Sequence, residues 1–182
     1  MNADVRPIKT AAETALADSF AAAKGRLPGV GALAALRAEA FRQFSTSGLP
    51  HRRVEEWKYT DLRALMRDAK PLAGPPDAAA RARAKDAGAA LASIEGRRIV
   101  FIDGAFAPAL SDLAGLEAGL SIRSMGEALA AGDPQVTSLL GKLVPTDDVA
   151  VALNTAFMGD GAVIRVGEGA ALAPKPANVS FE

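Results

Sequence analysis

The residues that could carry out chemistry in this chain are few, and the missing residue types exclude most catalytic and metal-binding designs. Cysteine is absent and His51 is the single histidine. The chain therefore cannot build a disulfide, a cysteine nucleophile or a thiolate metal site. A Ser-His-Asp triad would have to use His51, which has no carboxylate at a recognisable spacing. We predict no catalytic residue, no metal ligand and no bound cofactor, and expect a protein that is not an enzyme.

Two weaker patterns could bind a nucleotide or a cation, but neither has the context that this chemistry requires. Gly29-x-Gly31-x-x-Ala34 matches a loose dinucleotide-binding pattern, yet a turn precedes it where that motif needs a strand. Asp147, Asp148 and Asp160 could bind a hard cation, but they do not occupy alternate positions of one loop as calcium ligands do. We interpret the glycines as the start of a helix and expect no metal site.

The segment from Gly48 to Leu62 holds the highest density of functional side chains. It contains the single Trp and the single Tyr of the chain, Trp57 and Tyr59, interleaved with Arg52, Arg53 and Lys58. Such a pattern could stack bases and pair with phosphates, but three nearby carboxylates, those of Glu55, Glu56 and Asp61, cancel its positive charge. We therefore favour a structural role, in which Trp57 and Tyr59 anchor an extended connector, and predict no nucleic-acid partner.

The composition describes an alanine-rich chain of 182 residues with an uneven charge distribution. Residues 1–98 carry 17 Lys and Arg against 11 Asp and Glu, a net charge of +6, and residues 99–182 carry 4 against 10, a net charge of −6. We interpret this as two surfaces of one protein, with a basic arm that docks on an acidic partner as the alternative. No apolar run approaches the roughly 20 residues that span a bilayer, and the N-terminus lacks the apolar stretch of a signal peptide. We expect a cytoplasmic protein without a membrane partner.

The expected secondary structure that must position these residues changes after Gly96, from helices alone to strands mixed with short helices. Before it, capping and apolar periodicity predict helices, the first of which starts at the capping box Thr10-x-x-Glu13. These helices are expected at 10–24, 30–44, 60–67 and 78–94, with Asp77 just before the last of them. After it, strands are expected at 98–102, 105–107, 119–123, 162–166 and 178–181, with short helices at 125–130, 134–140 and 147–157. Asp103-Gly104 lies between two apolar runs and predicts a hairpin turn.

The last two expected strands suggest one rung of a solenoid, because a glycine-rich turn joins them. A single rung cannot bury its own faces, and about three are needed. The strand expected at 178–181 would also leave an open edge that could drive artificial self-association. We therefore expect the chain to be the N-terminal piece of a longer protein.

Several motifs, in one order along the chain, carry a resemblance to a known family. Gly48-Leu49-Pro50-x-Arg52-Arg53-x-Glu55-x-Trp57-Lys58-Tyr59-Thr60-x-Leu62 resembles the N-terminal signature of the SufD branch of the SufB/SufD family. Phe101-Ile102-Asp103-Gly104 and Leu153-Asn154-Thr155-Ala156-Phe157-x-x-Asp160-Gly161 continue the resemblance. The signature positions, as structural or docking residues, are Arg52, Arg53, Glu55, Trp57, Lys58, Tyr59, Asn154 and Asp160.

The resemblance implies an α+β fold in three parts. These are an N-terminal helical domain over 1–95, a small α/β segment over 96–160, and the first strands of a right-handed parallel β-helix over 161–182. It also implies a non-catalytic subunit of the Suf scaffold, which pairs with SufB and the ATPase SufC. The iron–sulfur cluster would then be a product of the assembled complex. The alternatives are a stand-alone helical protein-interaction module and an enzyme that uses Asp, Glu, Lys or Tyr in a cleft.

Overall fold

The computed structural model describes residues 9–88, 96–144, 147–171 and 177–181. The chain divides into two compact units, each built from two stretches of sequence. Unit 1 comprises Met1–Leu72 and Leu139–Met158, and unit 2 comprises Ala73–Ser138 and Gly159–Glu182. In the part of the chain that the structure describes, no helix is long and apolar enough to cross a membrane. The domain boundaries predicted at 95 and 160 stay predictions.

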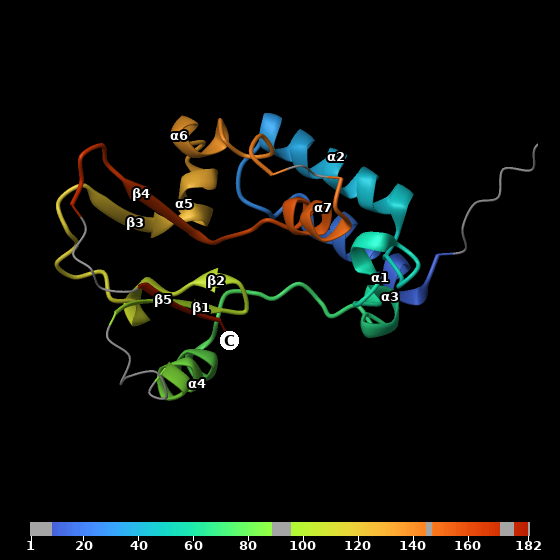
Figure 1. Cartoon of the computed structure of the whole chain (residues 1–182), viewed down its shortest axis with the longest axis horizontal. Helices are drawn as coiled ribbons and strands as arrows, with labels where there is room; N and C mark the ends of the chain where they lie inside the picture. Colours follow the sequence, from blue (N-terminus) through green and yellow to red (C-terminus); the bar gives the residue numbers. More distant parts are fainter. Residues whose placement is uncertain (1–8, 89–95, 145–146, 172–176, 182) are drawn as a thin grey trace, which may run out of the picture. The chain divides into compact units, whose positions relative to one another are not determined.

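Unit 1 is helical (Figure 1). Its elements are α1 (Ala11–Ala23), α2 (Ala32–Ser47), the 3₁₀ turn η1 (Glu55–Trp57), α3 (Leu62–Leu65) and α7 (Val149–Ala156). α1, α2 and α7 share one apolar core, whose buried side chains are Ala12, Leu16, Phe44, Leu49, Val149 and Ala152. Aromatic rings extend this core, because Phe20 stacks on Phe41 with ring centroids 4.2 Å apart and Phe157 packs edge-on against both.

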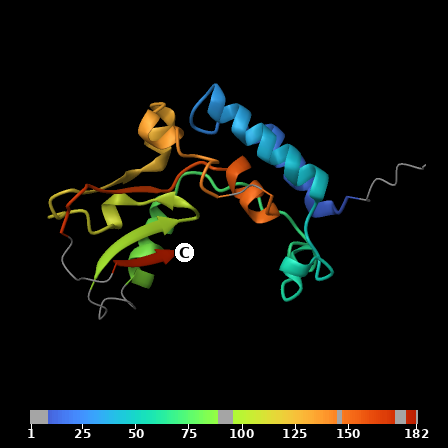
Figure 2. The same cartoon turned by 45° about the horizontal axis from the view of Figure 1, so that its top comes forward.

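Unit 2 combines small sheets with short helices. Its elements are α4 (Ala78–Gly88), β1 (Arg97–Ile102), β2 (Ala105–Phe106), the 3₁₀ turn η3 (Pro108–Leu110), β3 (Leu120–Ser124), α5 (Met125–Ala130), α6 (Pro134–Thr137), β4 (Ala162–Val166) and β5 (Ala177–Phe181). One sheet has the order β2-β1-β5, with β1 antiparallel to β2 and parallel to β5 (Figure 2). The other pairs β3 with β4 antiparallel, which places Ile122 opposite Ile164. α4 packs on β1 through Ala80 and Ala84.

The expected α+β fold and most of its elements are confirmed. Asp103 and Gly104 both have positive φ, at 49° and 83°, as a two-residue hairpin turn of type I′ requires. α2 ends at Ser47 instead of 44, because the N–H of Gly48 still bonds to the carbonyl of Phe44.

Three other helix predictions need correction at their ends. Asp148 was expected in the first turn of α7, but it precedes that helix as its N-cap and accepts from two backbone N–H groups. α6 ends at Thr137 instead of 140, and α3 covers only the middle of the expected 60–67. The helix expected over 78–94 begins at Ala78 as predicted and is described as α4 to Gly88, and 89–95 lies outside the described residues. Side-chain caps and turn hydrogen bonds therefore set these ends more tightly than periodicity alone indicates.

No β-helix is seen among the described residues. The strands expected to form one rung, β4 and β5, lie in separate small sheets, where β4 pairs with β3 and β5 pairs with β1. β5 is the last strand in the order β2-β1-β5. Self-association through it stays a prediction.

Candidate functional site

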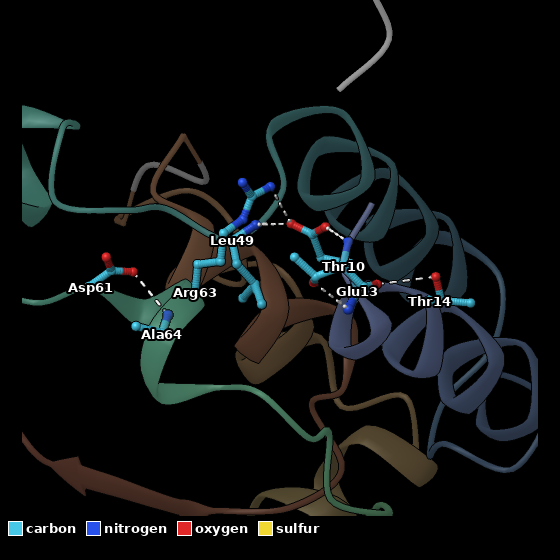
Figure 3. A network of polar contacts seen from close by, with 7 residues as sticks. All are labelled: Thr10, Glu13, Thr14, Leu49, Asp61, Arg63 and Ala64. Atoms are coloured by element: carbon cyan, nitrogen blue, oxygen red, sulfur yellow. Dashed lines mark hydrogen bonds and ion pairs between the residues drawn. The ribbon is translucent and has the colours of Figure 1, made fainter. Parts of the chain in front are cut away.

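Glu13 is a buried carboxylate at which three separate stretches of unit 1 meet (Figure 3). Its side chain is 4% exposed. One carboxylate oxygen, Oε2, accepts from the N–H of Thr10 at 2.6 Å, which closes the predicted capping box. The other, Oε1, accepts from the N–H of Leu49 at 2.7 Å and lies 3.6 Å from Nη2 of Arg63. Glu13 thus ties the start of α1 to Leu49 and to Arg63, which lie at the two ends of the segment between them.

The electrostatics of this network favour the charged form of Glu13. Burial by itself raises the pKa of this carboxyl, since the charged form loses water. The N–H bonds from Thr10 and Leu49, the Thr10 hydroxyl and the positive charge of Arg63 outweigh that effect and lower the pKa below 4.5. An ionised Glu13 therefore acts as a structural anchor, and both of its oxygens are engaged.

Gly48 lies directly against the carboxylate of Glu13, and we predict that replacing this glycine with alanine destabilises the fold. Its φ is +69°, and an added Cβ would lie 2.6 Å from Oε1 of Glu13. Gly31 has a similar φ of +61°, with nothing within 4 Å of an added Cβ. We expect Gly31→Ala to cost about 1–3 kcal/mol for its backbone alone. Gly48→Ala should cost about 1–2 kcal/mol more, because it also displaces the carboxylate from Leu49.

Urea unfolding of the two alanine variants at neutral pH measures this difference. Gly31→Ala is the matched control, because it carries a comparable backbone cost without the contact to Glu13. Equal losses of unfolding free energy in the two variants would show that the contact with Glu13 has no energetic weight.

Residues 51–62 form a compact loop with joined ends, called here the 51–62 loop. The N–H of Arg63 donates to the carbonyl of Pro50 at 3.1 Å and closes the loop. Inside it, the N–H groups of Val54, Trp57 and Thr60 each donate to a carbonyl three residues earlier, at 2.9 Å. The predicted extended connector is therefore wrong, since consecutive turns coil the segment. Compact surface loops of this kind are frequently functional.

The side chains of the 51–62 loop point mostly to solvent. Tyr59 is 92% exposed, so the prediction that it anchors the connector is wrong. Lys58 pairs with Glu55 at 2.5 Å, and its Nζ lies 5.3 Å from the centroid of the Tyr59 ring. Trp57 is half-buried. Arg52 and Arg53 are exposed, and within the described ranges neither side chain has an ion-pair partner.

Asp160 organises unit 2 much as Glu13 organises unit 1. Its Oδ1 accepts from the hydroxyl of Ser124 and the N–H of Gly126, both at 2.8 Å, and its Oδ2 accepts from the N–H of Phe106 at 2.9 Å. Burial raises the pKa of Asp160, but these bonds and one from the N–H of Gly161 outweigh it and lower the pKa overall. Asp160 therefore joins β2 to the start of α5 and is not a free ligand.

The remaining signature position, Asn154, lies exposed on α7 in unit 1. The eight signature residues are divided between the two units. Six of them belong to the 51–62 loop, Asp160 holds unit 2 together, and Asn154 faces solvent. In the described part of the chain, no group of three or more His, Asp or Glu residues is placed to hold a metal ion.

The amino-acid sequence also matches a known protein family. The model of the SufBD protein N-terminal region matches residues 11–176. The chain belongs to this SufBD family. A relative from Synechocystis sp., described as an iron-sulfur cluster assembly SufBD family protein, is 34% identical over 120 residues, which is 64% of this chain and 25% of that protein. The chain thus spans about a quarter of that relative's length. No solved structure matches it.

Membership of the SufBD family confirms the resemblance that the sequence motifs carry, at the level of the family. Sequence reasoning nevertheless missed two residues that hold this SufBD chain together. The sequence pattern indicates Glu13 only as half of a capping box, and nothing in its spacing indicates the bond to Leu49. Arg37 is 2% exposed, and it donates to the carbonyls of Pro28 and Met158 at 2.6 and 2.8 Å. An arginine on the apolar face of a predicted helix is the signal that could have identified it.

Proposed function

We propose that this chain is the N-terminal region of a SufD-type subunit, a non-catalytic part of the scaffold on which iron–sulfur clusters are assembled. In the full-length protein it would pair with SufB-like and SufC-like subunits. The observation that carries the proposal is the match of the SufBD N-terminal region over residues 11–176. The relative from Synechocystis sp., named for iron-sulfur cluster assembly, supports it. The SufD assignment rests on the block Trp57-Lys58-Tyr59-Thr60.

The chemistry of the side chains supports a non-catalytic role. Two carboxylates, those of Glu13 and Asp160, accept backbone N–H groups through both of their oxygens. Neither is free to take a proton from a substrate. The chain has no cysteine, and iron–sulfur clusters are held mainly by cysteine thiolates. The cluster would therefore be a product of the assembled complex and not a cofactor of this chain.

The proposal extends to the fold beyond the two small sheets. We place the start of a right-handed parallel β-helix at residue 161. β4 and β5 follow one another in sequence but lie in separate sheets, and β5 runs parallel to β1. The parallel pairing of β5 with β1 is the feature that supports this placement, whereas β4 pairs antiparallel with β3. A crystal structure of the full-length gene product in which the chain after β5 is helical would contradict this placement.

Co-purification from the native organism is the experiment that tests the proposed function. The full-length gene product, tagged at its own locus, is expected to elute together with SufB-like and SufC-like subunits. A strain that lacks the gene should accumulate iron–sulfur enzymes without their clusters, measured as iron bound per purified enzyme. A tagged protein that elutes with neither subunit, together with fully loaded enzymes in the deletion strain, would favour a stand-alone interaction module.

A further inference from the structure

The exposed residues of the 51–62 loop point to an interaction surface that the proposed function does not assign. We propose that this loop docks an acidic segment of a protein partner. Arg52 and Arg53 would bind carboxylates of that segment, and Tyr59 would pack against an apolar side chain between them. The inference rests on the geometry of the loop and does not depend on the proposed scaffold role.

The base of the loop is held firmly by unit 1. Leu49 is buried in the core shared by α1, α2 and α7, and Leu62 packs against the same core. Glu13 accepts from the N–H of Leu49 on one side of the loop and pairs with Arg63 on the other. A loop fixed at both ends loses little conformational entropy when it binds, which favours affinity.

Three side chains at its surface, those of Arg52, Arg53 and Tyr59, stay largely in solvent. Tyr59 leaves 92% of its surface in solvent, and Leu65, which ends α3 just after the loop, leaves 72% exposed. Arg52 and Arg53 are exposed and have no ion-pair partner in the described part of unit 1. Tyrosine and arginine are among the residue types that dominate binding energy at protein interfaces. Such a group, on a preorganised loop, suits a docking surface better than an ordinary solvated face.

The charges of the loop identify the chemistry of the partner. Its three cations and three carboxylates sum to zero, but they are not equally available. Lys58 is paired with Glu55, and Asp61 accepts from the N–H of Ala64 at the start of α3, at 2.9 Å. The guanidinium groups of Arg52 and Arg53 then remain as the cations of the loop without an ion-pair partner among the described residues. Guanidinium groups bind carboxylates in two-pronged pairs, so a segment with neighbouring carboxylates is the fitting ligand.

A nucleic acid is less suited to this loop. Binding to a phosphate backbone gains its strength from several cations that release counterions together. The two guanidinium groups that remain available in the loop supply few such contacts. The loop is therefore assigned to a protein segment, and nucleic-acid binding becomes an outcome of the test.

Titration of the ¹⁵N-labelled chain at low salt tests this inference. The probe is a capped peptide with the sequence Asp-Glu-Leu-Asp-Glu, and the control peptide is Asn-Gln-Leu-Asn-Gln. We expect amide shifts that concentrate in the 51–62 loop with the acidic peptide only. Arg52→Glu with Arg53→Glu should weaken its binding by about tenfold or more, and Tyr59→Ala by about fivefold.

The matched control reverses two exposed arginines elsewhere. Arg81→Glu with Arg83→Glu changes the net charge equally on α4 of unit 2 and should leave the affinity unchanged. Because all these side chains are exposed, the urea midpoints of the variants should match that of the parent chain. An affinity equally lowered by both double variants, or the absence of binding by the parent chain, would overturn the proposal. If the parent chain bound a short oligothymidylate more tightly than the acidic peptide, the loop would instead be a nucleic-acid surface. If the chain formed a dimer that Arg52→Glu with Arg53→Glu abolished, the loop would instead be a surface for self-association.

Discussion

Replacing Glu13 with Gln is expected to lower the free energy of unfolding of unit 1 by about 2–4 kcal/mol at neutral pH. The amide keeps the shape of the side chain but has one acceptor oxygen where the carboxylate has two. Either the N–H of Thr10 or that of Leu49 would then face an NH₂ group and lose its partner. Arg63 would also lose its counter-charge, and its Nε is already buried without a hydrogen-bond partner among the described residues. Urea unfolding at neutral pH measures the loss.

The pH dependence separates the charge of Glu13 from its shape. Its pKa is lower in the folded chain than its usual value of 4.5. Ionised Glu13 therefore stabilises the fold above that usual value, and the contribution fades as the pH falls through the lower folded pKa. The difference between the parent chain and Glu13→Gln should be constant at neutral pH and shrink in acid. Glu56→Gln is the control, because Glu56 is exposed in the same unit; equal stability of the two variants would contradict an anchoring role.

Features that depend on neighbouring residues could be predicted from the sequence. The capping box joins Thr10 to Glu13 three residues later, and its spacing alone indicates the start of α1. Asp103-Gly104 likewise forms the hairpin turn that its residue types predict. In both cases, the side chain or backbone that satisfies the pattern lies within a few residues, so no tertiary contact can override it.

The parts that sequence could not predict depend on contacts between distant residues. Glu13 reaches Leu49 across 36 positions, and Asp160 reaches Phe106 across 54. Nothing in the spacing of either carboxylate indicates such a partner. The same reason explains the error at Tyr59, since an aromatic residue is usually buried and only the closed 51–62 loop turns this one outward. The motifs that resemble SufBD proteins thus combine the half-buried anchor Asp160 with exposed side chains such as Tyr59, which sequence alone could not separate.

Asp160→Asn is expected to destabilise unit 2 by about 2–3 kcal/mol, the second large effect. The carboxylate accepts through both oxygens, from Ser124 and Gly126 on one and from Phe106 on the other. Whichever way the amide turns, its NH₂ group faces at least one donor. The space is also tight, because an added Cβ on Gly126 would lie 3.0 Å from Oδ1 of Asp160. If the amide turned away to relieve the conflict, the hydrogen bonds to its remaining oxygen would also be lost.

Asp86→Asn is the matched control for this change, because Asp86 is exposed on α4 of the same unit. It removes the same charge and should alter the unfolding free energy by less than about 0.5 kcal/mol. Because the pKa of Asp160 is lowered in the folded chain, its contribution is fully present at neutral pH and is lost as the pH falls through that lower value. The difference in unfolding free energy between Asp160→Asn and Asp86→Asn should therefore become smaller in acid. A difference that is absent at neutral pH would show that Asp160 does not hold β2 to the start of α5.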